Sequence, residues 1–136
     1  MTGQEEMLKL AQVHLEAELR MDLDGVLATL VPDPVYVLWD GRRVEGMDAV
    51  RSYYTRMFER VFPRLVSVDA SGLWVGEASV VAEGPVTMRD PGGGTATYTQ
   101  VSVIPFRDGL IEGERVYPSL DFARLLDDAF QGWPGE

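Results

Sequence analysis

The segment at residues 95–117, TATYTQVSVIPFRDGLIEGERVY, decides the fold. Two runs rich in β-branched residues flank Arg107, Asp108 and Gly109. This pattern is typical of a β-hairpin with a three-residue loop and Gly109 in the left-handed conformation. Counting outward from this loop predicts four cross-strand pairs: Phe106 with Leu110, Ile104 with Glu112, Ser102 with Glu114, and Gln100 with Val116.

Strand side chains alternate between two faces, so the members of these pairs share one face of the hairpin. That face places three polar side chains, Gln100, Ser102 and Glu114, among apolar ones. Water satisfies such groups on an open surface. Under a cover of helices the same groups form a site, and the rest of the sequence supplies helices for that cover.

The composition describes an acidic single domain. The chain has 136 residues, of which 46% are hydrophobic and 25% charged, and this length buries roughly two-thirds of the unfolded surface. A net charge of −10 argues against a nucleic-acid surface and against an anionic membrane. The lack of cysteine excludes disulfides and thiolate zinc sites. The N-terminus does not resemble a signal peptide and no apolar run reaches a membrane span, so we expect a cytoplasmic protein.

An amphipathic helix is predicted at residues 4–21. One arc of this helix is polar, and leucine, methionine and alanine fill most of the opposite arc. His14 and Glu18 are the exceptions, because both fall inside the apolar arc. They lie one helical turn apart, so their side chains can meet.

The remaining pattern predicts an α+β domain with a conical cavity. The expected elements, in order, are a short helix at 22–31 ended by Pro32 and Pro34, a small hairpin of strands 35–39 and 42–45, a helix at 47–61, strands at 64–75 and 79–89, the hairpin of 95–117, a helix at 120–130, and a loose tail at 131–136 whose Trp133 can fold back over a pocket mouth. Helices laid across a strongly curved antiparallel sheet leave a cavity between the two layers.

Four segments resemble the nuclear-transport-factor-2-like superfamily, and within it the SnoaL-like polyketide cyclases: residues 22–30 (DLDGVLATL), 33–36 (DPVY), 46–54 (GMDAVRSYY) and 106–117 (FRDGLIEGERVY). They extend over nearly the whole chain as one domain. The resemblance implies a cystatin-like fold, in which a curved antiparallel sheet wraps around N-terminal helices. Ketosteroid isomerases, scytalone dehydratase and limonene epoxide hydrolase share this fold with members that only bind or associate, so the fold alone does not determine function.

The resemblance to the cyclases does not extend to their acid–base residues. In the cyclases an aspartate on the last strand acts as acid and base, and a histidine on the preceding strand assists it. Aligning the resembling segments puts these two positions at Val116 and Ser102. Neither residue matches, so the cyclase mechanism does not carry over unchanged.

Glu114 is the candidate catalytic acid or base. It lies one strand alternation from the position of the cyclase aspartate, on the same face, and an apolar cavity raises the pKa of a carboxyl group. Gln100 and Ser102 are predicted to donate hydrogen bonds to a ligand oxygen. The alternative is a surface glutamate at a sheet edge, or one paired with Arg115 or another arginine.

His14 and Glu18 are the second candidate, a supporting dyad in which the carboxylate orients the imidazole as a base. The same pair offers two metal ligands, but with a single histidine in the chain we predict no metal site. The alternative is a buried hydrogen-bonded pair that ties the helix to the sheet without chemistry.

Aromatic side chains supply further candidates for ligand binding. Tyr36, Trp39 and Tyr54, together with Val116, are expected to line a pocket for a ring-containing ligand, with Tyr53 and Trp74 as additional candidates. Aromatic residues at these spacings also build ordinary cores, so this alternative stays open. The strand pattern does not decide whether Glu83 faces the cavity or the solvent.

Together these features predict binding of a hydrophobic, cyclic small molecule and proton transfer without an organic cofactor. Isomerase, cyclase, dehydratase and epoxide-hydrolase reactions all fit, and the alternative is a non-catalytic binding or dimerisation module. The outer hairpin face, with Val101, Val103, Arg115 and Tyr117, is too apolar for open water. Because relatives of this fold commonly dimerise through the outer sheet surface, we expect a two-fold homodimer there.

Overall fold

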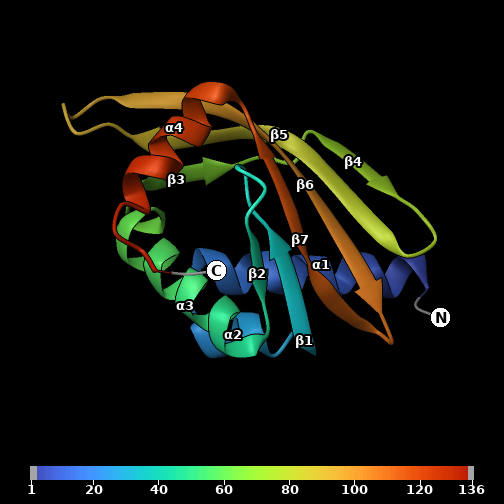
Figure 1. The fold of residues 1–136 in the computed structure, drawn as a ribbon. Helices are drawn as coiled ribbons and strands as arrows, with labels where there is room; N and C mark the ends of the chain where they lie inside the picture. Colours follow the sequence, from blue (N-terminus) through green and yellow to red (C-terminus); the bar gives the residue numbers. More distant parts are fainter. Residues whose placement is uncertain (1–2, 135–136) are drawn as a thin grey trace.

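The hairpin of residues 95–117 lies within a seven-stranded sheet in the structure, a computed structural model that describes residues 3–134 (Figure 1). The helices are α1 (Gln4–Leu19), α2 (Leu23–Leu27), α3 (Met47–Arg60) and α4 (Leu120–Ala129), with a 3₁₀ turn, η1 (Phe62–Arg64). The strands are β1 (Leu30–Val37), β2 (Arg43–Glu45), β3 (Leu65–Val68), β4 (Gly72–Val75), β5 (Ser79–Arg89), β6 (Thr95–Arg107) and β7 (Leu110–Pro118). The predicted α+β class is confirmed.

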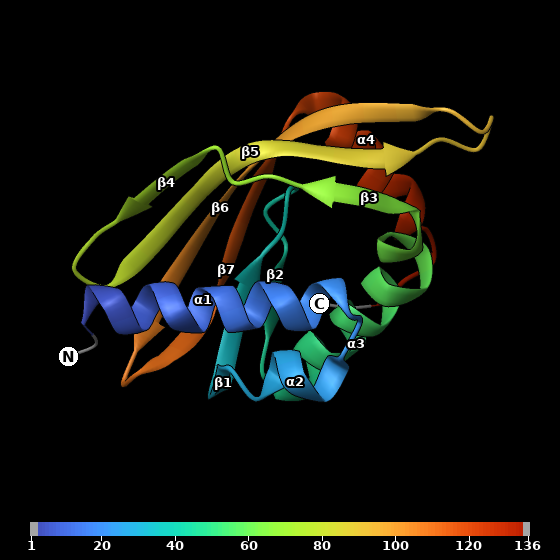
Figure 2. The ribbon, with the colours of Figure 1, turned by 180° about the vertical axis from the view of Figure 1, so that it is seen from behind.

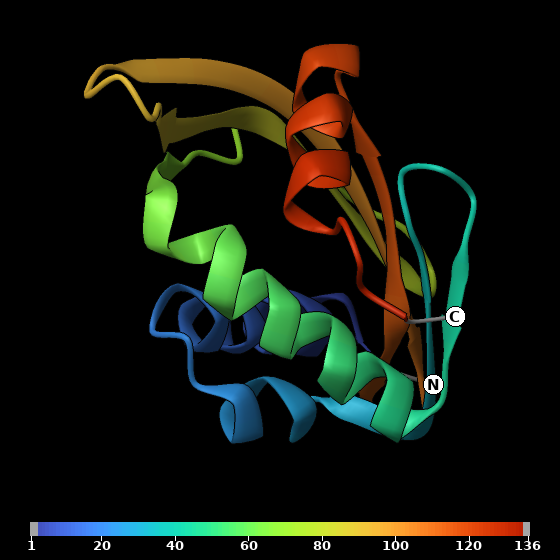
Figure 3. The same ribbon diagram turned by 60° about the vertical axis from the view of Figure 1, so that its left-hand side comes forward.

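The strand order is β2-β1-β7-β6-β5-β3, and β4 pairs with another part of β5. Neighbouring strands are antiparallel except for β1 and β7, which run parallel. The long strands bend so that one face of the sheet is concave, and α1 lies across that face (Figure 2). Helix α3 packs against β1 and β2, and α4 packs against β6 and β7 (Figure 3). The predicted curved, mostly antiparallel sheet is therefore confirmed.

The turn of the β6–β7 hairpin contains two residues, not three. Asp108 and Gly109 both have positive φ, 53° and 81°, as a type I′ turn requires. Consequently Arg107 pairs with Leu110, and Phe106 pairs with Ile111. The predicted loop was wrong because it assigned the left-handed conformation to Gly109 alone, whereas Asp108 adopts it too.

A bulge in β7 then shifts the pairing again. Beyond the irregularity between Val103 and Phe106, Ser102 pairs with Val116 and not with Glu114. The predicted register was therefore wrong by two residues. A shift of two leaves side chains on the same face, so Ser102, Glu114 and Val116 still share one, as does Gln100.

Gly113 lies inside this bulge and faces β1 at close range. It pairs with Val35 across the parallel β1–β7 ladder. A Cβ atom at this position would lie 1.7 Å from the Val35 carbonyl oxygen. Only glycine allows the two backbones to approach this closely, and the approach anchors β1 beside the strand that carries Glu114.

Two predicted elements differ in extent from the sequence pattern: one helix ends earlier, and one strand is split in two. The helix expected at 22–31 stops at Leu27, although Asp22 does cap it by accepting a hydrogen bond from the Gly25 amide at 3.0 Å. Pro32 lies in β1, where the pairing with β7 is interrupted, so its missing N–H breaks no paired position. The strand expected at 64–75 is divided into β3 and β4, because turn-forming residues separate them at 69–71.

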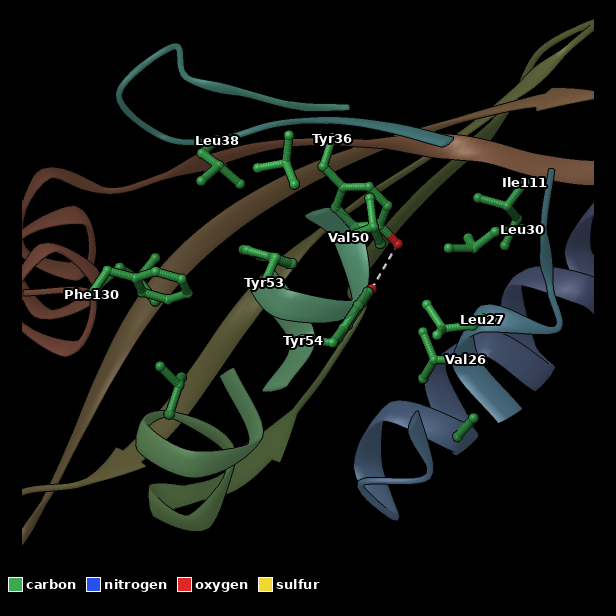
Figure 4. Close-up of a cluster of buried hydrophobic side chains, with 14 of the residues drawn as sticks. Val26, Leu27, Leu30, Tyr36, Leu38, Val50, Tyr53, Tyr54, Ile111 and Phe130 are labelled. Carbon is green, nitrogen blue, oxygen red and sulfur yellow. Dashed lines mark hydrogen bonds between the residues drawn. The ribbon is translucent and has the colours of Figure 1, made fainter. Parts of the chain in front are cut away.

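The helices bury a continuous apolar core against the sheet. Figure 4 shows part of this core, with Tyr36 from β1 and Tyr54 from α3 directed at one another. Met7 of α1 and Ile111 of β7 are fully buried. No helix within residues 3–134 is long and apolar enough to cross a membrane.

The described part of the C-terminal tail is packed against the fold. Trp133 is buried, and its ring centroid lies 5.1 Å from that of Phe130. Its indole Nε1 donates a hydrogen bond to Ser52 Oγ at 3.1 Å. Trp133 therefore folds back onto the body of the protein, as the sequence pattern allowed, while residues 135 and 136 lie outside the described range.

Candidate active site

A cavity of about 240 Å³ lies between α1, α3 and the concave face of the sheet. Most of its lining is apolar, from leucine, valine and alanine side chains of the helices and strands. Its polar lining residues are Gln12, His14, Glu18, Tyr53, Tyr54, Gln100, Ser102 and Glu114. An apolar pocket with a few convergent polar groups is the usual form of a small-molecule site.

The two ends of this cavity differ chemically. The exposed lining residues are mostly apolar and include Leu19 of α1, Val68 of β3 and Leu73 of β4, with Gln12 of α1 as a polar member. At the inner end the lining residues His14 and Tyr54 are buried. A ligand that enters therefore passes apolar side chains before it reaches the titratable groups.

Thr29 holds the imidazole of His14 in one orientation. Nδ1 of His14 lies 2.8 Å from Thr29 Oγ1, and the Thr29 hydroxyl donates its only hydrogen to the carbonyl oxygen of Val26 at 2.6 Å. Thr29 must then accept a hydrogen bond from His14, so Nδ1 carries a hydrogen. The other ring nitrogen, Nε2, is the one directed at the carboxyl groups.

Two carboxyl groups determine the charge of His14. Nε2 lies 3.3 Å from Glu18 Oε2 and 3.8 Å from Glu114 Oε2. Burial lowers the pKa of His14, but the combined effect of Glu18 and Glu114 exceeds it and raises the pKa from 6.5 to about 10. His14 is therefore an imidazolium at neutral pH.

Tyr54 connects this imidazolium to β1. Its hydroxyl donates to Glu18 Oε2 at 2.7 Å and lies 3.2 Å from His14 Nε2. The hydroxyl of Tyr36 lies 2.7 Å from that of Tyr54 (Figure 4), and because the hydrogen of Tyr54 is directed at Glu18, Tyr36 is the donor. Burial, followed by the nearby carboxylates, raises the pKa of both tyrosines, so both stay protonated.

Glu114 is the carboxyl group whose affinity for a proton is increased. Burial raises the pKa of Glu114; the imidazolium of His14, whose Nε2 lies 3.8 Å away, lowers it, and the charge of Glu18 raises it again. A hydrogen bond from Ser102 also favours the ionised form. Ser102 Oγ in turn accepts from Gln100 Nε2 at 3.2 Å, so a chain of two polar side chains ends on Glu114.

The structure brings together most of the side chains predicted for the site. His14 and Glu18 from α1, Tyr54 from α3, and Glu114 from β7 all line one cavity. It is also lined by Gln100, Ser102 and Val116. The expected contact between His14 and Glu18 is present, with the Tyr54 hydroxyl hydrogen-bonded to the same carboxylate.

Tyr36 and Trp39 do not belong to the cavity lining, contrary to the prediction. Tyr36 is the cross-strand neighbour of Glu114 but is fully buried in the core, where its ring packs against Tyr54 of α3. The indole Nε1 of Trp39 donates to Asp127 of α4 at 2.6 Å. Both positions depend on how the helices pack, which strand alternation does not reveal.

Trp74 and Glu83 lie outside the cavity as well. Trp74 is largely exposed on β4, where its neighbour Leu73 faces the cavity instead. Glu83 is exposed, and its neighbour Ala82 takes the inward position. Strand alternation therefore places both side chains on the outer face.

Sequence reasoning missed Thr29 and the linking role of Tyr54. Thr29 had been placed inside a predicted helix, where nothing marked it as a partner of His14. The available signal was that Thr29 is the polar residue in an otherwise apolar run at 26–31. Tyr54 was predicted as a ligand contact, but its hydrogen bond to Glu18 depends on the packing of α3 against α1.

The same site contains the described side chains that are grouped closely enough to hold a metal ion. One ligand atom from each of His14, Glu18 and Glu114 lies within 4.8 Å of the others. One nitrogen and two carboxylate oxygens suit several divalent metals. Such an ion would have to displace the Nε2 hydrogen of the imidazolium, because a metal ligand must present a free lone pair.

Comparison with known families identifies a relationship over most of the chain. The sequence profile of the SnoaL-like domain matches residues 11–113. A search of curated proteins gave no match to the chain. The family match covers the C-terminal half of α1, then α2, α3, the first six strands and the start of β7.

Solved structures share the fold at low sequence identity. An NTF2-like protein from Burkholderia xenovorans LB400 is 19% identical, with a TM-score of 0.75 over 95% of this chain and 98% of that one. SalBIII, an epoxide hydrolase/cyclase-like enzyme of pyran ring formation in the polyether salinomycin, is 17% identical, with a TM-score of 0.74 over 89% and 96%. A candidate polyketide cyclase from Xanthomonas campestris pv. campestris is 27% identical, with a TM-score of 0.66 over 88% and 94%.

Proposed function

The chain belongs to the SnoaL-like domain family, and we propose that it binds a hydrophobic, ring-containing small molecule and catalyses proton transfer through Glu114. The reaction is of the isomerase, cyclase, dehydratase or epoxide-hydrolase type and uses no organic cofactor. One observation carries the proposal. Glu114 is a carboxyl group at the inner end of an apolar cavity, with its pKa raised, beside a buried imidazolium.

Glu114 and His14 have different roles in this proposal. Ionised Glu114 accepts a proton from a carbon or hydroxyl group of the ligand, and the protonated form returns it. Its raised pKa brings the two forms closer in population near neutral pH, which favours acid–base catalysis. The positive charge of His14 stabilises negative charge that develops on a ligand oxygen. Ser102 and Gln100 orient the Glu114 carboxyl group.

Proteins of similar fold support chemistry of this kind. SalBIII is named as an epoxide hydrolase/cyclase-like enzyme, and the Xanthomonas protein as a candidate polyketide cyclase. Because Val116 and Ser102 occupy the positions expected for the cyclase aspartate and histidine, acid–base groups would have to come from elsewhere in the cavity. Glu114 on the same strand and His14 on α1 meet that requirement.

The test uses 5-nitrobenzisoxazole, a neutral bicyclic compound. When a base removes the proton on its ring carbon, the N–O bond breaks and a coloured cyanonitrophenolate forms, so the rate reports a base in an apolar site. We expect Glu114→Gln to lower this rate by about 100-fold. Glu112→Gln, on the same strand but outside the cavity lining, is the control and should leave the rate unchanged. Equal rates for the parent and Glu114→Gln would contradict the role of Glu114.

A non-catalytic binding module of the same fold is the second candidate. It is favoured by Val116 and Ser102, which replace the acid–base pair of the cyclases. In that case hydrophobic ligands bind the cavity, but the parent protein shows no rate above buffer with 5-nitrobenzisoxazole. Ligand affinity is then insensitive to Glu114→Gln.

We further propose that the chain forms a two-fold homodimer through the outer face of the sheet. Trp74 and Tyr117 on this face are 56% and 52% exposed, and Val101 and Val103 lie between them on β6. Burying such a surface against a second copy removes apolar area from water. Light scattering at micromolar concentration should give twice the monomer mass for the parent protein. The Trp74→Lys variant should give the mass of one monomer. A parent protein that is monomeric would contradict the dimer.

A further inference from the structure

The inner end of the cavity holds more negative than positive charge. The charged lining residues are His14, Glu18 and Glu114, and no lysine or arginine of residues 3–134 is among them. One imidazolium can offset one carboxylate. When Glu18 and Glu114 are both ionised, one negative charge in this apolar space has no counter-charge.

We propose that the ligand of this cavity carries a basic nitrogen, and that its protonated amine pairs with Glu114 and Glu18 at the inner end. This inference rests on the proposed function, because it assigns a chemical class to the ligand of the same site. The hydrocarbon part of the ligand would lie toward the apolar opening at Leu19, Val68 and Leu73.

The physical reason is the cost of burying an uncompensated carboxylate. Without a ligand, this cost appears as the raised pKa of Glu114, which burial shifts toward its neutral form. A ligand ammonium supplies the same positive charge and adds charge-assisted hydrogen bonds. The rings of Tyr53 and Tyr54 line the cavity too and offer further attraction to a cation.

The same charges reject anionic ligands. A ligand carboxylate would bring a third negative charge next to Glu18 and Glu114, with only His14 to offset all three. Fatty acids and other carboxylates are therefore expected to bind poorly, although the walls are apolar. Neutral alcohols are expected to bind with intermediate affinity, because they bring no charge into the cavity.

Amine binding is coupled to the ionisation of Glu114. The titratable groups around Glu114 are His14 and Glu18 from α1, Tyr53 and Tyr54 from α3, and Tyr36 from β1. His14 keeps its proton up to a pKa of about 10, and burial raises the pKa of all three tyrosines, so they stay neutral. The proton released on amine binding thus comes from Glu114. Binding leaves Glu114 ionised, which is the form that acts as a base.

The test is calorimetric titration with three ligands that share one ring system: 2-naphthylmethylamine, 2-naphthylmethanol and 2-naphthoate. At neutral pH we expect the amine to bind about tenfold more tightly than the alcohol, and the carboxylate to bind most weakly. Titrations in two buffers of different ionisation enthalpy should show proton release for the amine alone. Its affinity should rise with pH through the pKa of Glu114.

Two variants make the result decisive. Glu114→Gln should bring the amine and the alcohol to similar affinity and abolish the proton release, while the alcohol still binds, which shows that the cavity is intact. Glu112→Gln should change neither. If the alcohol or the carboxylate binds the parent as tightly as the amine does, the basic-nitrogen inference is overturned and the proposed binding function stands. If none of the three binds, both are overturned.

Discussion

Tyr53 and Tyr54 are consecutive buried residues of α3, and they connect this helix to different parts of the molecule. Tyr53 packs on Phe130 at 5.6 Å between ring centroids, and Phe130 packs on Trp133 at 5.1 Å. This aromatic closure (Tyr53, Phe130, Trp133) joins α3 to α4 and the tail. Tyr54, the next residue, instead presents its hydroxyl to Glu18.

The two groups of side chains differ in what they contribute: one stabilises the fold, and the other holds the ionisable groups of the site. The aromatic closure contributes mainly by burying apolar surface, which stabilises the fold. The charged end (His14, Glu18, Tyr54, Glu114) contains ionisable groups that are expensive to bury, and buried ion pairs often contribute little net stability. Every buried side-chain polar atom in residues 3–134 has a hydrogen-bond partner. A charged network completed in this way beside an open cavity is better explained by a function than by stability.

The largest expected effect comes from the aromatic closure. Phe130→Ala should lower the free energy of unfolding by about 3–5 kcal/mol, because it leaves a hole among packed rings. Leu120→Ala, at the start of α4, is the control, since Leu120 is 68% exposed, and should change stability by about 0.5 kcal/mol or less. Urea denaturation measures both. Equal losses for the two variants would show that the rings do not close the fold.

Removal of His14 should have a smaller effect on stability and a larger one on binding. His14→Ala leaves Glu18 and Glu114 without their buried counter-charge, and we expect a loss of about 1–3 kcal/mol. His14→Gln keeps a hydrogen-bonding side chain but loses the charge. If His14→Gln folds normally and binds the cavity ligand as well as the parent does, the role of His14 is structural, and any activity rests on Glu114 alone.

The stability of the parent should depend on pH through the charged end. The pKa of His14 is raised on folding from 6.5 to about 10, so the folded state keeps a proton that the unfolded state releases. The stabilisation is complete below pH 6.5 and is lost as pH rises toward about 10. We expect denaturation midpoints that fall across this window, and a flatter dependence in His14→Gln. A parent protein whose stability rises with pH in this window would contradict the imidazolium.

The smallest effect is expected at Ser102. Its hydrogen bond favours ionised Glu114, so Ser102→Ala should raise the pKa of Glu114 further. The pH profile of proton abstraction from 5-nitrobenzisoxazole should then move to higher pH by a fraction of a unit, with the maximum rate little changed. A shift to lower pH would show that the Ser102 hydroxyl does not stabilise the carboxylate.

The sequence was sufficient to predict which face of the central hairpin carries the polar residues. Alternation placed Gln100, Ser102 and Glu114 together, and a register error of two residues did not change that result. The register itself depended on the conformation of Asp108 and on the bulge at Gly113. Both arise from contacts with the turn and with β1 that a single strand pattern does not contain.

The sequence pattern was also sufficient to predict which side chains meet in the cavity. It was not sufficient to predict the hydrogen bonds that link them. His14 and Glu18 were identified because they interrupt an apolar helical arc, and that arc faces the sheet. Trp39 and Tyr36 were misplaced because α3 and α4 cover them, which depends on helix packing. Thr29 was missed because its partner is 15 residues away on another element.

The central claim is that burial raises the pKa of Glu114 beside a charged His14. A carbon-13 NMR titration of the glutamate carboxyl groups tests it directly, with Glu114→Gln assigning the signal and nitrogen-15 shifts reporting the imidazole. We predict that Glu114 titrates above 4.5 and that both ring nitrogens of His14 remain protonated at pH values between 6.5 and about 10. A Glu114 signal that titrates at or below 4.5, together with a His14 ring that is neutral in that window, would contradict the claim.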